Sequence, residues 1–97
     1  MKDLAYIQKI LRSCKPLLEK DFKVKSLGVF GSCVRGEQTK RSDVDILVEY
    51  SQTPGLFDFI RTENFLSKAL GNRVDLVMKG SLKPAIGKNV MREVVFI

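Results

Sequence analysis

The chain has 97 residues, a formal net charge of +6, two cysteines and no histidine, and this length predicts that residues 1–97 form a single domain with a modest core. The absence of histidine excludes histidine-dependent catalysis and most zinc sites, and the two cysteines lack paired-ligand spacing, so we expect free thiols. No apolar run could cross a bilayer and no signal-peptide block follows Met1, which predicts a cytoplasmic protein without membrane association.

The first part of the chain predicts two short helices, a strand and a loop. Apolar residues recur at spacings of three and four from Leu4 to Leu18, which is typical of an amphipathic helix. Pro16 lies inside this pattern and lacks a backbone donor, so we expect a break near Ser13 and a second short helix to about Asp21. The following residues predict a strand over 24–30, a helical turn over 33–36 and a polar loop over 36–42.

The second part of the chain predicts two strands separated by a helix. Residues 43–50 and 73–78 alternate as strands, and residues 82–91 predict a helix with Pro84 in its first turn. A helix over 56–70 precedes Gly71, and its apolar stripe comprises Leu56, Phe59, Ile60, Leu66 and Leu70. With a short final strand over 94–97, the predicted fold class is α+β, a small mixed β-sheet with helices packed mainly on one face.

Asp43, Asp45 and Asp75 are the candidate catalytic and metal-binding residues. Asp43 and Asp45 are two apart on one predicted strand, so both carboxylates project from the same face and repel each other unless a cation neutralises them. Oxygen ligands of this kind suit magnesium. Asp75 interrupts an apolar strand, which is unfavourable without a partner. If the two strands are neighbours, Asp75 completes a cluster of three carboxylates.

Gly31, Ser32, Arg35 and Ser42 are the candidate nucleotide-binding residues. Glycine lets a phosphate approach the backbone, where amide groups and the Ser32 hydroxyl could hold its oxygens. Arg35 either neutralises a phosphate or pairs with Glu37, and Ser42 either contacts the nucleotide or braces its loop. The sequence Gly-Ser is followed, after ten residues, by Asp-x-Asp. This arrangement should occur by chance in roughly one in a thousand chains of this length.

This combination predicts a site for a nucleoside triphosphate and two metal ions. Such ions clamp the attacking and leaving oxygens of an in-line displacement, and pyrophosphate leaves. Asp75 serves either as a metal ligand or as the general base. Residues 1–26 carry a net charge of +4 and residues 78–97 of +3, against −1 between them. These basic ends either attract a polyanion such as nucleic acid or only aid solubility.

The segment FGSCVRGEQTKRSDVDILV is similar to the signature of the DNA polymerase β-like nucleotidyltransferase superfamily. Its Arg35-Gly36-Glu37 and Ser42-Asp43 context resembles the minimal nucleotidyltransferases of bacteria and archaea, and the resemblance covers nearly the whole chain. Val34 stands where alanine is commoner in the family. We expect that departure to affect the packing of the loop and not the binding of metal.

The resemblance implies that Asp43 and Asp45 bind Mg²⁺, that Asp75 is the third carboxylate, and that Gly31 and Ser32 hold the triphosphate of ATP. Members of this class are often encoded with HEPN proteins as toxin–antitoxin pairs. The nucleotidyltransferase is the antitoxin, and some members adenylylate a tyrosine of the HEPN toxin. A chain of this size leaves little room for an acceptor-binding domain, so a partner protein could supply it.

Three functions follow as alternatives. The first is transfer of AMP from ATP to a HEPN toxin. The second is a non-catalytic antitoxin that binds and occludes its toxin, for which the basic ends and small size provide the support. The third is nucleotidyl transfer to a small molecule or an RNA end. The residues leave the base of the nucleotide, the acceptor atom and the oligomeric state open.

Overall fold

One long helix, α1 (Leu4–Asp21), opens the computed structural model, which describes residues 3–39 and 41–97. Asp3 caps this helix, because its side chain accepts a hydrogen bond from the Tyr6 amide. The break expected near Ser13 is wrong, since α1 continues through Pro16. Ile7 and Leu18, on either side of the proline, are fully buried, and this burial outweighs the one lost backbone hydrogen bond.

Four strands form one mixed sheet in the order β3-β2-β1-β4. They are β1 (Val24–Phe30), β2 (Val44–Tyr50), β3 (Val74–Met78) and β4 (Val95–Phe96). β1 pairs antiparallel with β2 and β4, whereas β2 and β3 run parallel. All four predicted strands are therefore confirmed, although β2 and β3 each begin one residue later than expected and β4 is one residue shorter at each end.

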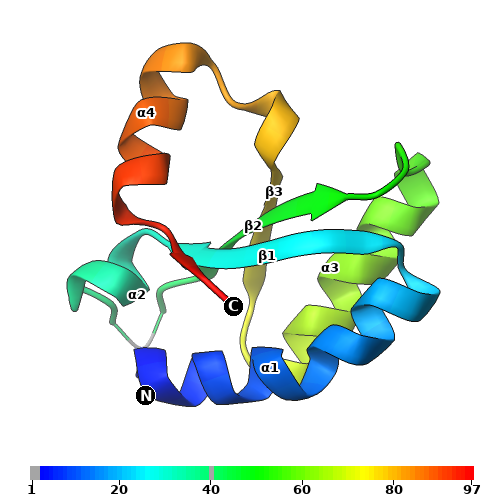
Figure 1. Cartoon of the computed structure of the whole chain (residues 1–97). Coiled ribbons are helices and arrows are strands. Elements are labelled where there is room, and N and C mark those ends of the chain that lie inside the picture. The colour runs from blue at the N-terminus through cyan, green and yellow to red at the C-terminus, as the bar shows by residue number, and fades with distance from the viewer. Residues whose placement is uncertain (1–2, 40) are drawn as a thin grey trace.

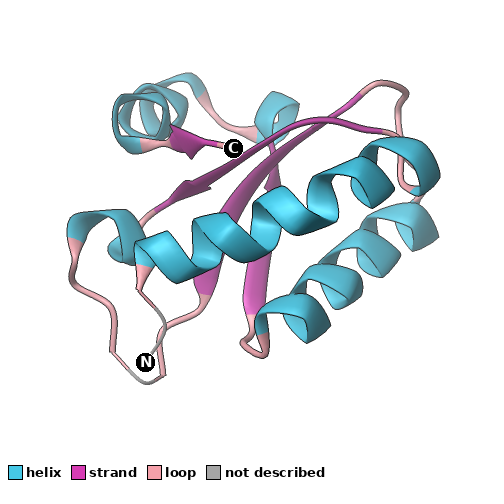
Figure 2. Cartoon of the chain, turned by 60° about the horizontal axis from the view of Figure 1, so that its bottom comes forward, coloured by secondary structure: helices cyan, strands magenta, loops and turns pink. Residues whose placement is uncertain are grey.

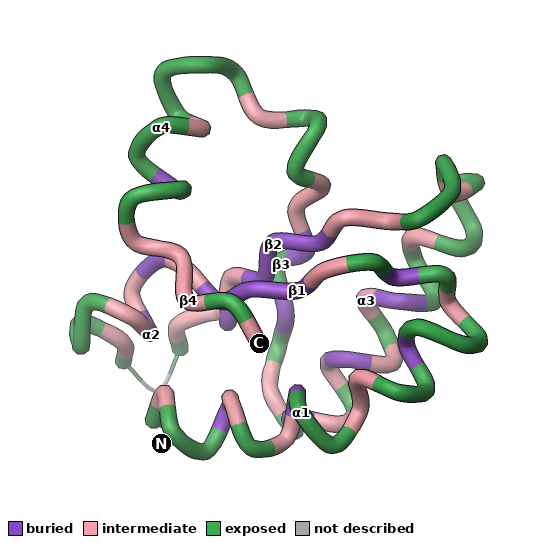
Figure 3. The backbone as a smooth tube through the Cα atoms, in the orientation of Figure 1, coloured by how far each residue is buried: buried purple, intermediate pink, exposed green. Residues whose placement is uncertain are grey.

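Helices α1 and α3 (Leu56–Leu70) lie side by side on one face of the sheet (Figure 2). The buried segments concentrate where these helices meet β1 and β2 (Figure 3), and the main apolar cluster joins both helices to the first three strands. The last helix, α4 (Pro84–Glu93), and the 3-10 turn η1 (Lys79–Ser81) lie on the other side of the sheet (Figure 1). The predicted α+β class is confirmed, with its two long helices on one face.

The buried stripe of α3 differs from the predicted one. Leu56 is 72% exposed and Ile60 is 40% exposed, so these two assignments are wrong. Leu66 and Leu70 are buried as predicted and Phe59 packs partly buried against the core, whereas the buried Thr62 was not predicted. The Tyr50 hydroxyl donates to Thr62 Oγ1 at 2.8 Å, and Thr62 donates to a carbonyl of its own helix. These bonds satisfy the threonine hydroxyl, which explains how a polar residue occupies a core position. Gly71 ends the helix in the left-handed region, as predicted.

Side chains of α3 cover the outer edge of β3. The Val74 amide donates to Ser67 Oγ at 3.2 Å, and the Leu76 amide donates to Glu63 Oε2 at 3.1 Å. These two amides flank Asp75, so α3 holds the part of β3 that carries this carboxylate. No helix among the described residues is long and apolar enough to cross a membrane.

Candidate active site

Asp45 and Asp75 are direct partners across the parallel pair of β2 and β3. Residues paired in this way project from the same face of a sheet, on strands about 4.8 Å apart. Their neighbours Val44, Ile46 and Val74 are buried in the core on the opposite face. The strand adjacency that the sequence only assumed is therefore confirmed. Asp45 is half-buried and Asp75 is exposed.

Asp43 immediately precedes β2 and adds a third negative charge to this face. The pKa of Asp45 is raised to about 6, first by burial, then by the charges of Asp75 and Asp43. Arg35 opposes this shift and Glu93 adds to it. The face therefore gathers more negative charge than its own cations offset, which is the situation a divalent cation relieves.

The carboxylate donors at Asp43, Asp45 and Asp75 suit magnesium, which prefers oxygen ligands. Across residues 3–39 and 41–97, no three acidic, cysteine or histidine side chains are arranged closely enough to hold one ion. The three aspartates are thus neighbours without forming a coordination shell.

Gly31 ends β1 beside Asp45 in a backbone conformation that favours glycine, with φ of 80°. A Cβ atom placed on Gly31 would overlap Asp45 Oδ2. The short helix α2 (Ser32–Arg35) begins at the next residue. Gly31 is therefore required both by its φ angle and by its close approach to the central carboxylate.

Carboxylates already engage two of the predicted nucleotide-binding residues. The Gly31 amide donates to Glu93 Oε1 at 2.9 Å, and Arg35 Nη1 donates to both oxygens of Glu93 at 3.1 and 2.9 Å. Arg35 also pairs with Glu37. The hydrogen bonds that Arg35 donates to Glu37, and then to Glu93, raise the pKa of Arg35. The sequence left phosphate contact and Glu37 pairing open for Arg35, and the pairing is present.

The two predicted serines differ in their surroundings. Ser32 Oγ makes no hydrogen bond within the described part of the chain. The Ser42 hydroxyl accepts from the Thr39 amide at 2.8 Å, and the Ser42 carbonyl accepts from Asn72 Nδ2 at 3.2 Å. Ser42 thus braces the loop before β2, which is one of its two predicted roles. Cys33 is a buried thiol whose pKa is raised by burial and by Asp45, so it is inert.

Glu93 is the residue of this site that the sequence interpretation missed. It is the last residue of α4, 62 positions from Gly31 in sequence. One signal could have drawn attention to it, because Glu93 is the sole acid in the otherwise basic segment 78–97. A lone acid next to a predicted helix end does not by itself indicate its partner.

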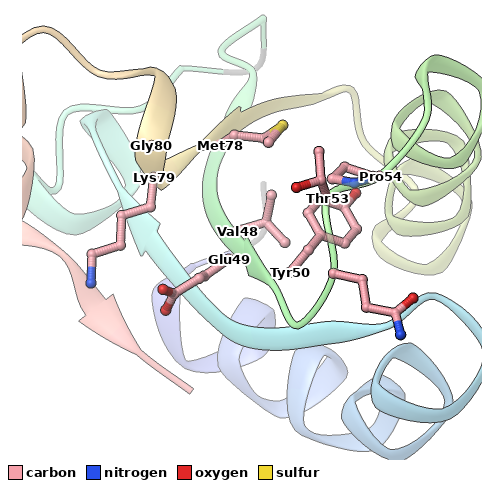
Figure 4. Close-up of a pocket in the computed structure, with 9 residues that line it drawn as sticks. Val48, Glu49, Tyr50, Thr53, Pro54, Met78, Lys79 and Gly80 are labelled. Atoms are coloured by element: carbon pink, nitrogen blue, oxygen red, sulfur yellow. The ribbon is translucent and has the colours of Figure 1, made fainter.

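A pocket of about 470 Å³ lies at the other end of the same two strands. Val48, Tyr50 and Met78 line it from the ends of β2 and β3, with Thr53 and Pro54 from the following loop (Figure 4). The aspartates lie toward the beginnings of these strands, so the carboxylate site and the pocket are separate features.

Replacing Asp45 with asparagine should stabilise the fold at neutral pH. The folded-state pKa of about 6 exceeds the ordinary value of 3.8, so ionised Asp45 disfavours folding above pH 6, and folding regains stability as the pH falls from 6 to 4. Thermal unfolding in EDTA should give Asp45→Asn a higher Tm than the original chain at pH 7.5, with the difference vanishing near pH 4. Glu19→Gln on the exposed face of α1 is the control, and a pH-independent difference would contradict the assignment.

Comparisons with known proteins agree with this geometry. The chain matches the nucleotidyltransferase domain family over residues 7–97. It is 52% identical to the protein adenylyltransferase MntA of Thermococcus cleftensis, over all of this chain and 98% of that one. A solved putative minimal nucleotidyltransferase superposes with a TM-score of 0.75 and 33% identity, covering 97% of this chain and 95% of the other.

A solved toxin–antitoxin structure with AMP-PNP also shares the fold. Its TM-score is 0.68 at 29% identity, and the match covers 93% of this chain and 68% of that one. The family match spans most of the chain and includes the Gly-Ser and Asp-x-Asp signature. The chain therefore belongs to the nucleotidyltransferase domain family, and it is similar over nearly its whole length to a minimal nucleotidyltransferase.

Proposed function

We propose that this chain transfers AMP from ATP to a tyrosine hydroxyl of a partner HEPN toxin, with Mg²⁺, and so acts as an antitoxin. The observation that carries the proposal is the direct pairing of Asp45 with Asp75, with Asp43 beside them and Gly31 against Asp45. Residues 1–97 act as one domain in this proposal, and the partner supplies the acceptor.

Each residue has a defined part in the transfer. Asp43 and Asp45 would hold Mg²⁺ together with the nucleotide, and Mg²⁺ bound there would offset the charge that develops on the phosphates. Ser32, the Gly31 backbone, Arg35 and Ser42 position the triphosphate. Asp75 is the exposed carboxylate, so it can reach an acceptor hydroxyl as its general base or share the metal. The acceptor oxygen forms a bond to the α-phosphorus of ATP. The bond between the α-phosphorus and the oxygen that bridges to the β-phosphorus breaks, and pyrophosphate leaves.

The relatives support the nucleotide and the partner. The Thermococcus cleftensis relative is named a protein adenylyltransferase, and the toxin–antitoxin structure was solved with AMP-PNP. The resemblance to minimal nucleotidyltransferases supplies the HEPN toxin and its tyrosine as acceptor. A protein acceptor also agrees with the exposed apolar side chains of Leu56 and Phe57, which are 72% and 79% exposed on α3.

The test is a transfer assay with a HEPN toxin as acceptor, Mg²⁺ and ATP labelled at the α- or γ-phosphate. The α-label should appear on the toxin, the γ-label should not, and replacing the toxin's acceptor tyrosine with phenylalanine should remove the signal. Transfer to a small molecule or an RNA end without any toxin would overturn the choice of acceptor. Full neutralisation of the toxin without label would favour occlusion instead.

A further inference from the structure

Glu93 connects the C-terminal end of α4 to the loop that follows β1. Its carboxylate accepts the Gly31 amide at 2.9 Å and the Arg35 guanidinium at 2.9 and 3.1 Å. The Glu93 side chain is only 25% exposed, whereas Glu37, the other partner of Arg35, is 62% exposed. Glu93 is therefore the inner of the two carboxylates that hold Arg35, and among the contacts described it alone also holds Gly31.

The position of Glu93 is fixed by the sheet. Two residues beyond it, β4 pairs with β1, with Val95 opposite Val29. The same strand β1 leads directly into Gly31. Glu93 and Gly31 thus lie next to two paired strands, β4 and β1. The hydrogen bond between the Gly31 amide and the Glu93 carboxylate adds a second link between these two segments.

A fourth carboxylate near three aspartates is unfavourable unless nearby cations or hydrogen-bond donors offset its negative charge. The charge of Glu93 adds to the forces that raise the pKa of Asp45. Its own partners, Arg35 and the Gly31 amide, offset this repulsion. Because Gly31 already lies against Asp45, any shift of the Gly31 peptide changes the distance between the loop and the central carboxylate.

We infer that Glu93 is a positioning residue for nucleotide binding, which sets the Gly31 peptide and the Arg35 guanidinium in place for the triphosphate. The inference rests on the proposed nucleotidyl transfer. Glu93 acts through Gly31 and Arg35 and does not itself touch the reacting atoms. The signature between Gly31 and Asp45 is then incomplete without the C-terminal end of α4.

Two substitutions separate the two contacts. Glu93→Ala removes the contacts with both Gly31 and Arg35. Glu93→Gln keeps an oxygen that can accept the hydrogen bond from the Gly31 amide, but it loses the charge that pairs with Arg35. Glu93→Ala should lower kcat/KM for ATP about ten- to a hundredfold, mainly through KM. Amide hydrogen exchange at Gly31 should accelerate in Glu93→Ala and much less in Glu93→Gln. Glu37→Gln is the matched control, and it should leave exchange at Gly31 unchanged.

The outcomes distinguish this inference from the proposed function. An original chain that transfers no AMP defeats the proposed function. An active original chain whose Glu93→Ala variant is folded and has unchanged KM defeats only the inference. A lower KM for ATP in Glu93→Ala would also overturn it, because the carboxylate would then compete with the triphosphate. Raised KM with faster Gly31 exchange supports it.

Discussion

Replacing Asp43 and Asp45 together with asparagine should reduce AMP transfer by at least about a thousandfold. Asparagine keeps the volume of each side chain but removes the negative charge that, in the proposed mechanism, holds the cations, so charge developing on the phosphates would no longer be stabilised. The variant should remain folded, because the substitution removes a charge at Asp45 whose burial, followed by repulsion from Asp75 and Asp43, raises the pKa of Asp45 to about 6. Initial rates of α-label transfer and circular dichroism measure the two effects.

The matched control for this experiment is Asp21→Asn. Asp21 is an exposed aspartate at the end of α1, on the helical face of the sheet and away from the site. Its variant should transfer AMP at the original rate. If the double variant at Asp43 and Asp45 retained more than a tenth of the activity, the catalytic role of these carboxylates would be wrong.

Replacing Gly31 with alanine should both destabilise the fold and inactivate the site. The new Cβ meets Asp45 Oδ2, so either the loop or the carboxylate must move. We expect a loss of about 2–4 kcal/mol in the free energy of unfolding, because φ of 80° with ψ of −150° is a backbone conformation essentially restricted to glycine and because the new Cβ overlaps Asp45. Transfer should fall at least about a hundredfold, because the displaced loop would no longer face the carboxylates of the candidate site.

Gly36→Ala measures the cost of a positive φ angle without any overlap. Gly36 lies in the left-handed helical region, with φ of 71° and ψ of 23°, whereas Gly31 has ψ of −150°, and nothing lies within 4 Å of the Cβ added at Gly36. Its variant should lose only about 1 kcal/mol, the cost of the left-handed conformation. Equal losses in the two variants, measured by urea unfolding, would show that contact with Asp45 is unimportant.

Local sequence patterns predicted most of the fold because they report local physics. The alternation of apolar residues placed Asp45 and Asp75 on the face opposite the core, and the register of β2 and β3 then brought them together. Pro16 misled the prediction because its lost hydrogen bond is a local cost, while the burial of Leu18 is a tertiary gain. Ile60 was predicted to be buried because it is apolar and lies on the predicted stripe, but an apolar side chain on a helix can remain exposed.

The candidate site was predictable only where its residues are close in sequence. Gly31 and Asp45 lie within one signature, so their spacing identified them. Glu93 meets Gly31 because β4 pairs with β1, and that pairing of a two-residue strand leaves almost no pattern in the sequence. The role of Ser42 depended likewise on Asn72, 30 positions away.

The most direct test of the account is a crystal structure with Mn²⁺ and a non-hydrolysable ATP analogue. We expect anomalous density for metal within about 2–2.3 Å of oxygens of Asp43 and Asp45, with the triphosphate against Ser32. Asp75 should face either the metal or the open position where an acceptor oxygen would attack. Nucleotide bound only in the pocket between Tyr50 and Met78, with no metal at the aspartates, would contradict the account.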